Sequence, residues 1–242
     1  MLVFGIHPVL EALRARRVAA VRVADKDNPR HREILELAKS MGVAVHRESA
    51  ERLESRARGQ VHQGVVAELT EVRSYGVADL VTGAAAVPLI VVLDGIEDPH
   101  NLGAILRTAD AAGADGVVVQ DRRSAARSGV AAKASAGALA HVRLAEVVNV
   151  ARAVEELKDL GVWTVGLAGD APTAYDELDL KGPTALVFGA EGAGLRRLVR
   201  DRCDFLAAIP MAGQVGSLNV SVAAGVVLFE AVRQRRAGAG SP

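Results

Sequence analysis

The sequence predicts an α/β protein whose larger, C-terminal part contains a parallel sheet. Half of its residues are hydrophobic but only 3% are aromatic, so the apolar side chains are mainly alanine, valine and leucine, which suit close packing of helices on a sheet. Short valine, isoleucine and leucine runs alternate with helical patterns, as in a parallel sheet covered on both faces. A polar stretch near 70–88 separates this part from a smaller α/β region. We expect domains at 1–70 and 87–242, joined by a linker at 71–86.

The smaller region alternates helical and strand patterns over about 70 residues. Strands are expected at 18–23, 43–46 and 65–69. Helices are expected around 9–13, at 34–38 before Gly42, and at 50–58 before Gly59. These elements predict a small α/β layer.

The larger region follows a more regular pattern. Strands are expected at 89–93, 116–119, 162–167 and 186–188, with a weaker one at 205–209. Helices are expected at 102–112, 148–160, 195–202 and 220–235, and a short one at 77–81 interrupts the linker. Because ligands in open α/β sheets bind beyond the carboxyl ends of the strands, the loops after these strands are the candidate site.

The first polar loop follows the strand at 89–93 and contains Asn101 and Arg107. Asn101 is placed to cap a helix that begins at Leu102, which would be a structural role alone. Arg107 points almost opposite to the apolar face of that helix, as a solvated arginine does. Its guanidinium could instead hold a phosphate through two parallel hydrogen bonds.

The second loop is the glycine-rich turn that follows the strand at 186–188 and includes Gly189, Glu191, Gly192 and Gly194. Glycine lets the backbone approach a ligand closely, and a helix N-terminus favours anionic groups. The turn lacks the Lys-Ser/Thr ending of a P-loop and lies too late for a dinucleotide fingerprint. Glu191 disfavours phosphate and could accept hydrogen bonds from a ribose or an amine.

The third loop spans 209–221 and leads into an alanine- and valine-rich helix. Ser217 and Asn219 lie at its end, where either could simply cap the helix. Three such loops, in chain order on one predicted sheet, indicate a shared site.

Composition limits the other function classes. The formal net charge is zero and Cys203 is the only cysteine, so an intrachain disulfide and a cysteine-based metal site are excluded, and we expect no metal. We interpret Cys203 as a small filler near a strand start. The N-terminus lacks the basic segment of a signal peptide, and no apolar run reaches the roughly 18 residues of a membrane span. We therefore expect a cytoplasmic protein in which any RNA contact comes from a local patch.

Together the three loops resemble the SpoU/TrmH-type RNA ribose methyltransferases of the SPOUT class. The first motif is Asp-Pro-His-Asn-Leu-Gly at 98–103 with Arg107. The second is Phe-Gly-Ala-Glu-Gly at 188–192, and the third runs from Ile-Pro-Met at 209–211 to Ser-Leu-Asn-Val-Ser at 217–221. Segments 4–9 and 61–64 are similar to N-terminal segments of the bacterial 23S ribosomal RNA (guanosine-2′-O-)-methyltransferases.

The resemblance implies a trefoil knot in the C-terminal domain, an exception to unknotted topology. It also implies an N-terminal domain like the ribosomal protein L30 family that helps to bind RNA, and a homodimer with each site completed near the interface. The cofactor would be S-adenosylmethionine. Its implied binding residues are Gly189, Ile209, Leu218, Leu167, Ala168, Gly169, Glu191 and Gly192.

The resemblance also implies transfer of a methyl group to the ribose 2′-hydroxyl of a guanosine in 23S ribosomal RNA. Arginine is protonated in proteins, so a role for Arg107 as the base would need an exceptional environment. Arg107 would instead clamp the RNA phosphate and stabilise the developing alkoxide. Asn101 would orient Arg107 or the ribose, with Glu191, Ser217 and Asn219 shaping the pocket.

RNA contacts are expected from a run of positive charge and from the N-terminal domain, although the run could also be a solvated loop. The expected residues are Arg122, Arg123, Arg127, Lys133, His62 and Gln63. Three alternatives stay open: the same chemistry on tRNA or on another ribosomal RNA nucleotide, a non-catalytic RNA-binding protein, and a nucleotide-dependent oxidoreductase that uses the turn at 189–194.

Overall fold

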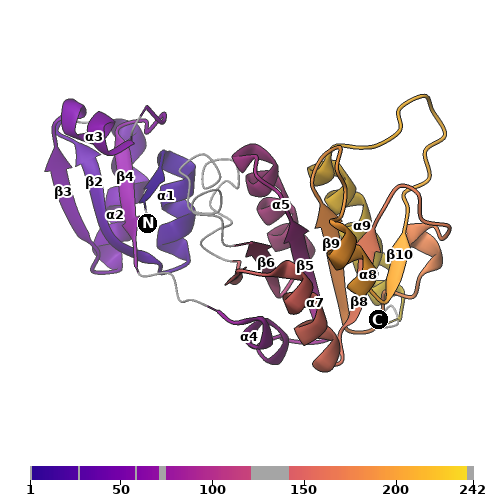
Figure 1. Cartoon of the computed structure of the whole chain (residues 1–242). Coiled ribbons are helices and arrows are strands. Elements are labelled where there is room, and N and C mark those ends of the chain that lie inside the picture. Colours follow the sequence, from indigo (N-terminus) through magenta and orange to yellow (C-terminus); the bar gives the residue numbers. More distant parts are fainter. Residues whose placement is uncertain (1, 27, 58, 71–74, 121–141, 239–242) are drawn as a thin grey trace.

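The computed structural model contains two sheets that lie side by side, the N-terminal one at the left of Figure 1 and the C-terminal one at the right. The structure describes residues 2–26, 28–57, 59–70, 75–120 and 142–238. Helix α4 (Val77–Thr82) confirms the short helix expected between the two regions.

In the part of the chain that the structure describes, the N-terminal sheet has four strands in the order β1-β4-β2-β3. The strands are β1 (Leu2–Phe4), β2 (Val18–Ala24), β3 (Ala44–Glu48) and β4 (Val65–Leu69). β2 and β3 run parallel, whereas β4 is antiparallel to β1 and β2. The three expected strands are confirmed, and β1 is an addition that is too short to stand out as an apolar run.

Helices cover both faces of this sheet. They are α1 (Ile6–Arg14), the 3-10 helix η1 (Pro29–His31), α2 (Arg32–Ser40) and α3 (Ala50–Ala57). Leu13 of α1 and Ile34 of α2 are buried in the same apolar cluster as Val21 of β2. Leu53 of α3 packs with Phe4 on the opposite face. The expected small α/β layer is confirmed.

Within the described ranges, the C-terminal sheet has six strands in the order β10-β8-β9-β5-β6-β7. The strands are β5 (Leu89–Asp94), β6 (Gly116–Gln120), β7 (Leu144–Val147), β8 (Trp163–Leu167), β9 (Thr184–Gly189) and β10 (Phe205–Ala207). Every neighbouring pair runs parallel. This pairing confirms the predicted parallel sheet. The carboxyl ends of the strands therefore lie together at one edge. The knot that the resemblance implies stays a prediction.

Two helical layers bury this sheet. The helices are α5 (Pro99–Ala112), α7 (Val150–Asp159), the 3-10 helix η3 (Tyr175–Glu177), α8 (Arg197–Arg202) and α9 (Val220–Gly238). Buried residues of α5 and α9 share one apolar cluster with one face of the strands. Buried residues of α4, α7 and α8 pack on the other face. β5, in the middle, is buried along its whole length.

The start of α5 corrects one sequence expectation. The helix begins at Pro99, and the side chain of Asp98 caps it by accepting a hydrogen bond from the backbone N–H of His100 at 3.0 Å. Proline suits a first helical position because the missing N–H would have no partner there. Asn101 is therefore not the cap, and it lies buried within the first turn.

Cys203 is partly buried where α8 packs against the sheet. Its Sγ donates to the backbone oxygen of Val199 at 3.3 Å, and burial raises the pKa of the thiol to about 12. These contacts agree with the interpretation of Cys203 as a packing residue.

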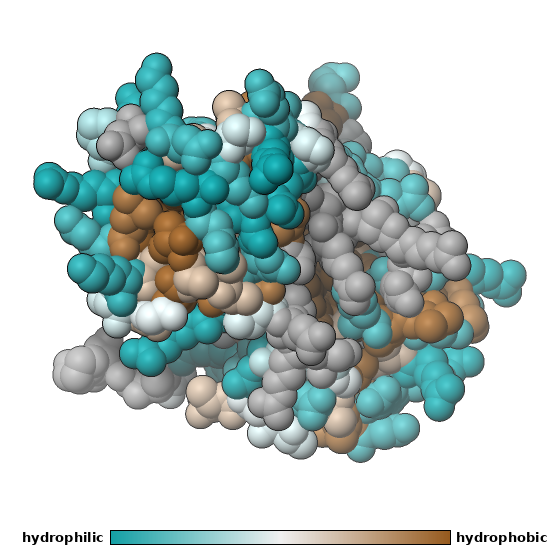
Figure 2. All heavy atoms as spheres, turned by 90° about the vertical axis from the view of Figure 1, so that its left-hand side faces the viewer, coloured by the Kyte–Doolittle hydropathy of each residue, from teal (hydrophilic) through white to brown (hydrophobic). Residues whose placement is uncertain are grey.

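The surface at the N-terminal side is mainly hydrophilic, with a compact apolar area bordered by hydrophilic side chains (Figure 2). Among the helices that the structure describes, none combines the length and the apolar character needed to cross a membrane. The described residues also include no cluster of three or more histidine, cysteine or acidic side chains suited to a metal ion.

Candidate active site

A hollow of about 510 Å³ lies at the carboxyl edge of the C-terminal sheet. The loops after β8, β9 and β10 surround it, together with the segment that leads into α9. All eight residues that the sequence assigns to the cofactor line this hollow: Leu167, Ala168, Gly169, Gly189, Glu191, Gly192, Ile209 and Leu218. Ser217 and Asn219 also line it. The chain thus brings the second and third motifs together, and their binding of a cofactor stays a prediction.

The glycine-rich turn approaches its own strand very closely. A Cβ atom at Gly189 would lie 2.1 Å from the backbone carbon of Gly194, so glycine is required at the end of β9. The turn is closed by a hydrogen bond of 2.8 Å from the N–H of Gly194 to the oxygen of Ala190. Gly192 and Gly194 adopt positive φ angles, which glycine tolerates without steric cost. The backbone itself forms this wall of the hollow.

A buried carboxylate fixes the far end of the same turn. Asp94, the last residue of β5, is 1% exposed. Its oxygens accept hydrogen bonds from the backbone N–H of Arg196 at 2.8 Å and from the Arg196 Nε at 2.6 Å. Asp94 was not predicted as a site residue from the sequence. The available signal was a carboxylate directly after a fully apolar strand.

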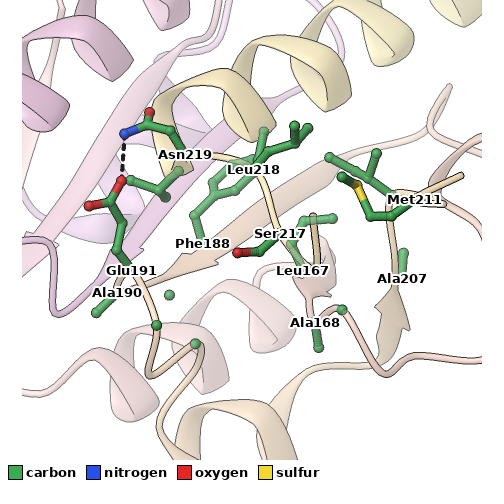
Figure 3. A pocket seen from close by; sticks show the side chains of 18 residues that line it. Leu167, Ala168, Phe188, Ala190, Glu191, Ala207, Met211, Ser217, Leu218 and Asn219 are labelled. Atoms are coloured by element: carbon green, nitrogen blue, oxygen red, sulfur yellow. Dashed lines mark hydrogen bonds between the residues drawn. The ribbon is translucent and has the colours of Figure 1, made fainter. Parts of the chain in front are cut away.

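Asn219 links the three motifs through its side-chain amide. Its Nδ2 donates to Asn101 Oδ1 at 2.9 Å and to Glu191 Oε1 at 2.5 Å, and Figure 3 shows the Glu191 and Asn219 side chains pointing toward each other. Its Oδ1 accepts from the backbone N–H of Ser221 at 2.9 Å, which caps the start of α9. Asn219 therefore caps the helix and also organises the site.

A second, smaller hollow of about 360 Å³ adjoins the first. The two share Ala190, Glu191 and Val220. Asn101 and Asp98 line the smaller hollow from the first motif. Ala190, Glu191 and Val220 therefore stand at the boundary between the two hollows, with Asn101 on one side and Asn219 on the other.

Arg107 does not join this arrangement within one chain. Its side chain is exposed on α5 and lines neither hollow. Gly189 and Leu218 share a cleft as the sequence analysis expects, whereas Arg107 lies apart from it.

The structure describes only some of the candidate RNA-binding residues. Arg122, Arg123, Arg127 and Lys133 lie outside the described residues. His62 Nε2 lies 3.2 Å from Glu54 Oε2, and Gln63 Oε1 accepts from the N–H of Ile6 at 3.0 Å. Both side chains therefore have local structural contacts, and their contact with RNA stays a prediction.

Comparison with protein families matches two models to the two regions. Residues 88–229 match the SpoU rRNA methylase family. Residues 2–75 match the substrate-binding domain of RNA 2′-O ribose methyltransferases.

Known proteins match over nearly the whole chain. The 23S rRNA (guanosine-2′-O-)-methyltransferase RlmB of Pseudomonas aeruginosa is 47% identical, covering 96% of each chain. The SpoU methyltransferase AviRb from Streptomyces viridochromogenes, solved with its cofactor AdoMet, is 26% identical with a TM-score of 0.82, covering 98% of this chain and 91% of that chain. The A. aeolicus TrmH/SpoU tRNA modifying enzyme is 30% identical with a TM-score of 0.59, but covers only 67% of this chain and 84% of its own. The chain belongs to the SpoU rRNA methylase family.

Proposed function

We propose that this protein transfers a methyl group from S-adenosylmethionine to the ribose 2′-hydroxyl of a guanosine in 23S ribosomal RNA. The observation that carries the proposal is the meeting of the second and third motifs around one hollow at the sheet edge, with Asn219 tied to Asn101 of the first. The named activity of RlmB from Pseudomonas aeruginosa, similar over 96% of this chain, supports the substrate.

The hollow fits S-adenosylmethionine in size and in chemistry. Its volume of about 510 Å³ lies in the range of small-molecule sites. Leu167, Phe188, Ile209 and Leu218 supply apolar walls for an adenine ring, and the turn at Gly189 brings backbone groups close. AdoMet in the AviRb structure supports the same assignment. When bound, this cofactor supplies a methyl group that its sulfonium charge already activates.

The chain itself has to orient the ribose and assist loss of the hydroxyl proton. We assign Asn101, Glu191, Ser217 and Asn219 to shaping the pocket, because all four line the adjoining hollows. Arg107 stays the proposed clamp for the RNA phosphate, where its guanidinium would stabilise the negative charge that develops on the ribose oxygen.

A homodimer would account for the position of Arg107. On α9, Val222 and Phe229 are 51% and 49% exposed and lie seven residues apart, on one face of the helix. Gly225 lies between them and approaches the Thr108 side chain, next to Arg107 on α5. A second copy seated on this apolar face would therefore bring its own surface beside Arg107. Replacing Phe229 with Asp should convert a dimer into a monomer in light-scattering measurements.

The N-terminal domain favours ribosomal RNA over tRNA as the substrate. The A. aeolicus tRNA-modifying enzyme aligns with only 67% of this chain. A separate substrate-binding region at 2–75 therefore suggests a larger RNA target. We place the domain boundaries near residues 70 and 87. We expect the protein to act in the cytoplasm, where ribosomal RNA is assembled into ribosomes.

Mapping 2′-O-methyl groups on ribosomal RNA from cells with and without this protein tests the proposal. We expect one guanosine of 23S ribosomal RNA to lose its methyl group in the deletion. The purified protein should restore it with labelled S-adenosylmethionine. If the deletion removes a methyl group from tRNA instead, or removes none from any RNA, the assignment is refuted.

A further inference from the structure

A third hollow, in the N-terminal domain, plays no part in the proposed methyl transfer. Its volume is about 520 Å³, and it lies where the parallel strands β2 and β3 end. Val23 and Ala24 of β2 form part of its wall, and Pro29 of η1 and Leu35 of α2 form another part. Apolar walls of this kind suit a flat, weakly polar group such as a nucleobase.

Charged side chains line the same hollow. Among the described residues that line it, Lys26, Arg32 and Arg47 carry positive charge and Glu36 carries the one carboxylate. Arg32 Nε lies 3.6 Å from Glu36 Oε1, and both side chains are well exposed. The chain as a whole has a formal net charge of zero, so an excess of cations around one hollow marks a local site for an anion.

His31 supplies a buried polar atom at this hollow. The residue is only 3% exposed and lines the hollow. Its Nε2 lies 2.9 Å from the backbone oxygen of Gln63. A carbonyl only accepts, so Nε2 carries the hydrogen, and in the neutral ring Nδ1 is left as an acceptor. Nδ1 has no hydrogen-bond partner among the described residues.

The unpartnered atom is not sealed inside the protein. Within the part of the chain that the structure describes, Gln120 Oε1 is the only enclosed side-chain nitrogen or oxygen without a partner. His31 Nδ1 is thus not fully enclosed, although its residue is almost entirely buried. Because His31 lines the hollow, a ligand bound there could donate to Nδ1 and satisfy this acceptor.

We infer that this hollow binds one unpaired nucleotide of the RNA substrate. The base lies between the apolar walls and donates an N–H to His31 Nδ1, while Lys26 and Arg32 contact the adjacent phosphates. Sequence-specific RNA recognition commonly uses such unstacked bases. The inference rests on the proposed function for the identity of the substrate and adds a second point of attachment in the N-terminal domain.

A double variant tests the phosphate contacts in the full-length protein. Fluorescence anisotropy with labelled ten-nucleotide oligo(U) and oligo(A) should show roughly tenfold weaker binding for Lys26→Ala/Arg32→Ala. The log–log salt slope should fall by about 1.4, because each phosphate contact on a single strand contributes about 0.7. Lys39→Ala/Arg52→Ala is the matched control: it removes the same charge from exposed positions outside the hollow. Equal loss in both variants would overturn the inference.

A histidine variant tests the base contact. His31→Gln keeps an N–H to face Gln63, but its amide oxygen cannot occupy the position of Nδ1, so the acceptor proposed to face the base is displaced. We expect several-fold weaker binding of base-bearing oligonucleotides and unchanged binding of an abasic RNA of the same length. Equal weakening of both probes, or binding of a ten-base-pair duplex as tight as that of the single strand, would refute a base in the hollow.

Methylation assays separate this inference from the proposed function. Lys26→Ala/Arg32→Ala should raise KM for 23S ribosomal RNA about tenfold and leave kcat and cofactor affinity unchanged. If the variant is active and its KM is unchanged, the nucleotide site in the hollow is refuted, whereas the proposed function still stands. If the wild-type protein fails to methylate 23S ribosomal RNA while the oligonucleotide results hold, the proposed function fails and the nucleotide site stands.

Discussion

The two sheets of the molecule differ in how much of their surface meets solvent. In the C-terminal sheet every neighbouring pair of strands runs parallel, and helices bury both faces. In the N-terminal sheet β3 lies at an edge, and four of its five residues are exposed. A parallel sheet buried on both faces leaves its carboxyl edge for binding, whereas an open edge leaves side chains along a whole strand accessible.

The two sheets also differ in what their charged residues hold together. Arg22 of β2 contacts Glu48 of β3 at 3.1 Å and Glu68 of β4 at 2.9 Å, so ion pairs link neighbouring strands of the N-terminal sheet. In the C-terminal sheet the buried carboxylate Asp94 instead holds Arg196 after the glycine-rich turn. The N-terminal region uses charge to join neighbouring strands, and the C-terminal region uses it to fix the glycine-rich turn.

Gly189→Ala should have the largest effect, because it acts on the backbone at the carboxyl edge of the C-terminal sheet. The new Cβ would lie 2.1 to 2.3 Å from backbone atoms of Gly194 and Leu195, so the turn has to move away from the strand. We expect methylation to fall to background and cofactor binding, measured by calorimetry, to be lost. Gly182→Ala, where a Cβ meets nothing within 4 Å, should leave both unchanged.

Arg107→Ala should lower the methylation rate by about 1,000-fold and leave cofactor affinity within a few fold. Arg107 lines neither hollow, so its proposed role concerns RNA, and loss of a charge-stabilising group has effects of this order. Single-turnover assays and cofactor titration measure the two quantities. Arg152→Ala, at an exposed position on α7, is the matched control. A large loss of cofactor affinity would instead give Arg107 a structural role.

Asn219→Asp should lower kcat by about 10- to 100-fold, the scale of a small misplacement at a site. Aspartate is as good a helix cap as asparagine, so the start of α9 is kept. The lost amide is the donor to Asn101 and Glu191, and a second carboxylate would repel Glu191. Steady-state kinetics with a thermal unfolding control measures the effect. Unchanged kcat at unchanged stability would contradict a role in organising the site.

The sequence was sufficient for most of the C-terminal fold because its signals are local. Apolar runs such as 89–93 identify buried strands, and glycines with polar residues after them identify the loops of the site. β7 escaped prediction because Glu146 interrupts its short apolar run and because, within the described residues, it pairs with β6 alone at the sheet edge. The cap of α5 was misassigned although Asp98 and Pro99 carry the usual signal for a helix start.

Contacts between distant segments could not be read from the sequence in the same way. Asp94 and Arg196 are 102 residues apart, and an aspartate after a strand is as typical of a solvated turn. His31 lies in a stretch of polar residues, and only the fold brings its ring against Gln63. Motif spacing predicts which loops meet, whereas the partner of each buried polar atom depends on the folded geometry.

Glu48→Gln should have the smallest effect, because it acts on the exposed edge strand of the N-terminal sheet. Glu48 also contacts Arg56 at 2.8 Å, and its hydrogen bond to Arg56 lowers the pKa of the carboxyl group below its usual value, although burial opposes the shift. A lowered pKa stabilises the fold above the unfolded-state value, about 4.3, and this stabilisation is lost as pH falls through the folded-state pKa. We expect urea unfolding to give a free energy about 1 kcal/mol lower for the variant near pH 7. That difference should disappear as the pH is lowered below about 4. Methylation near neutral pH should not change. A variant that loses activity without losing stability would show that the two sheets are coupled more tightly than their separate charge networks indicate.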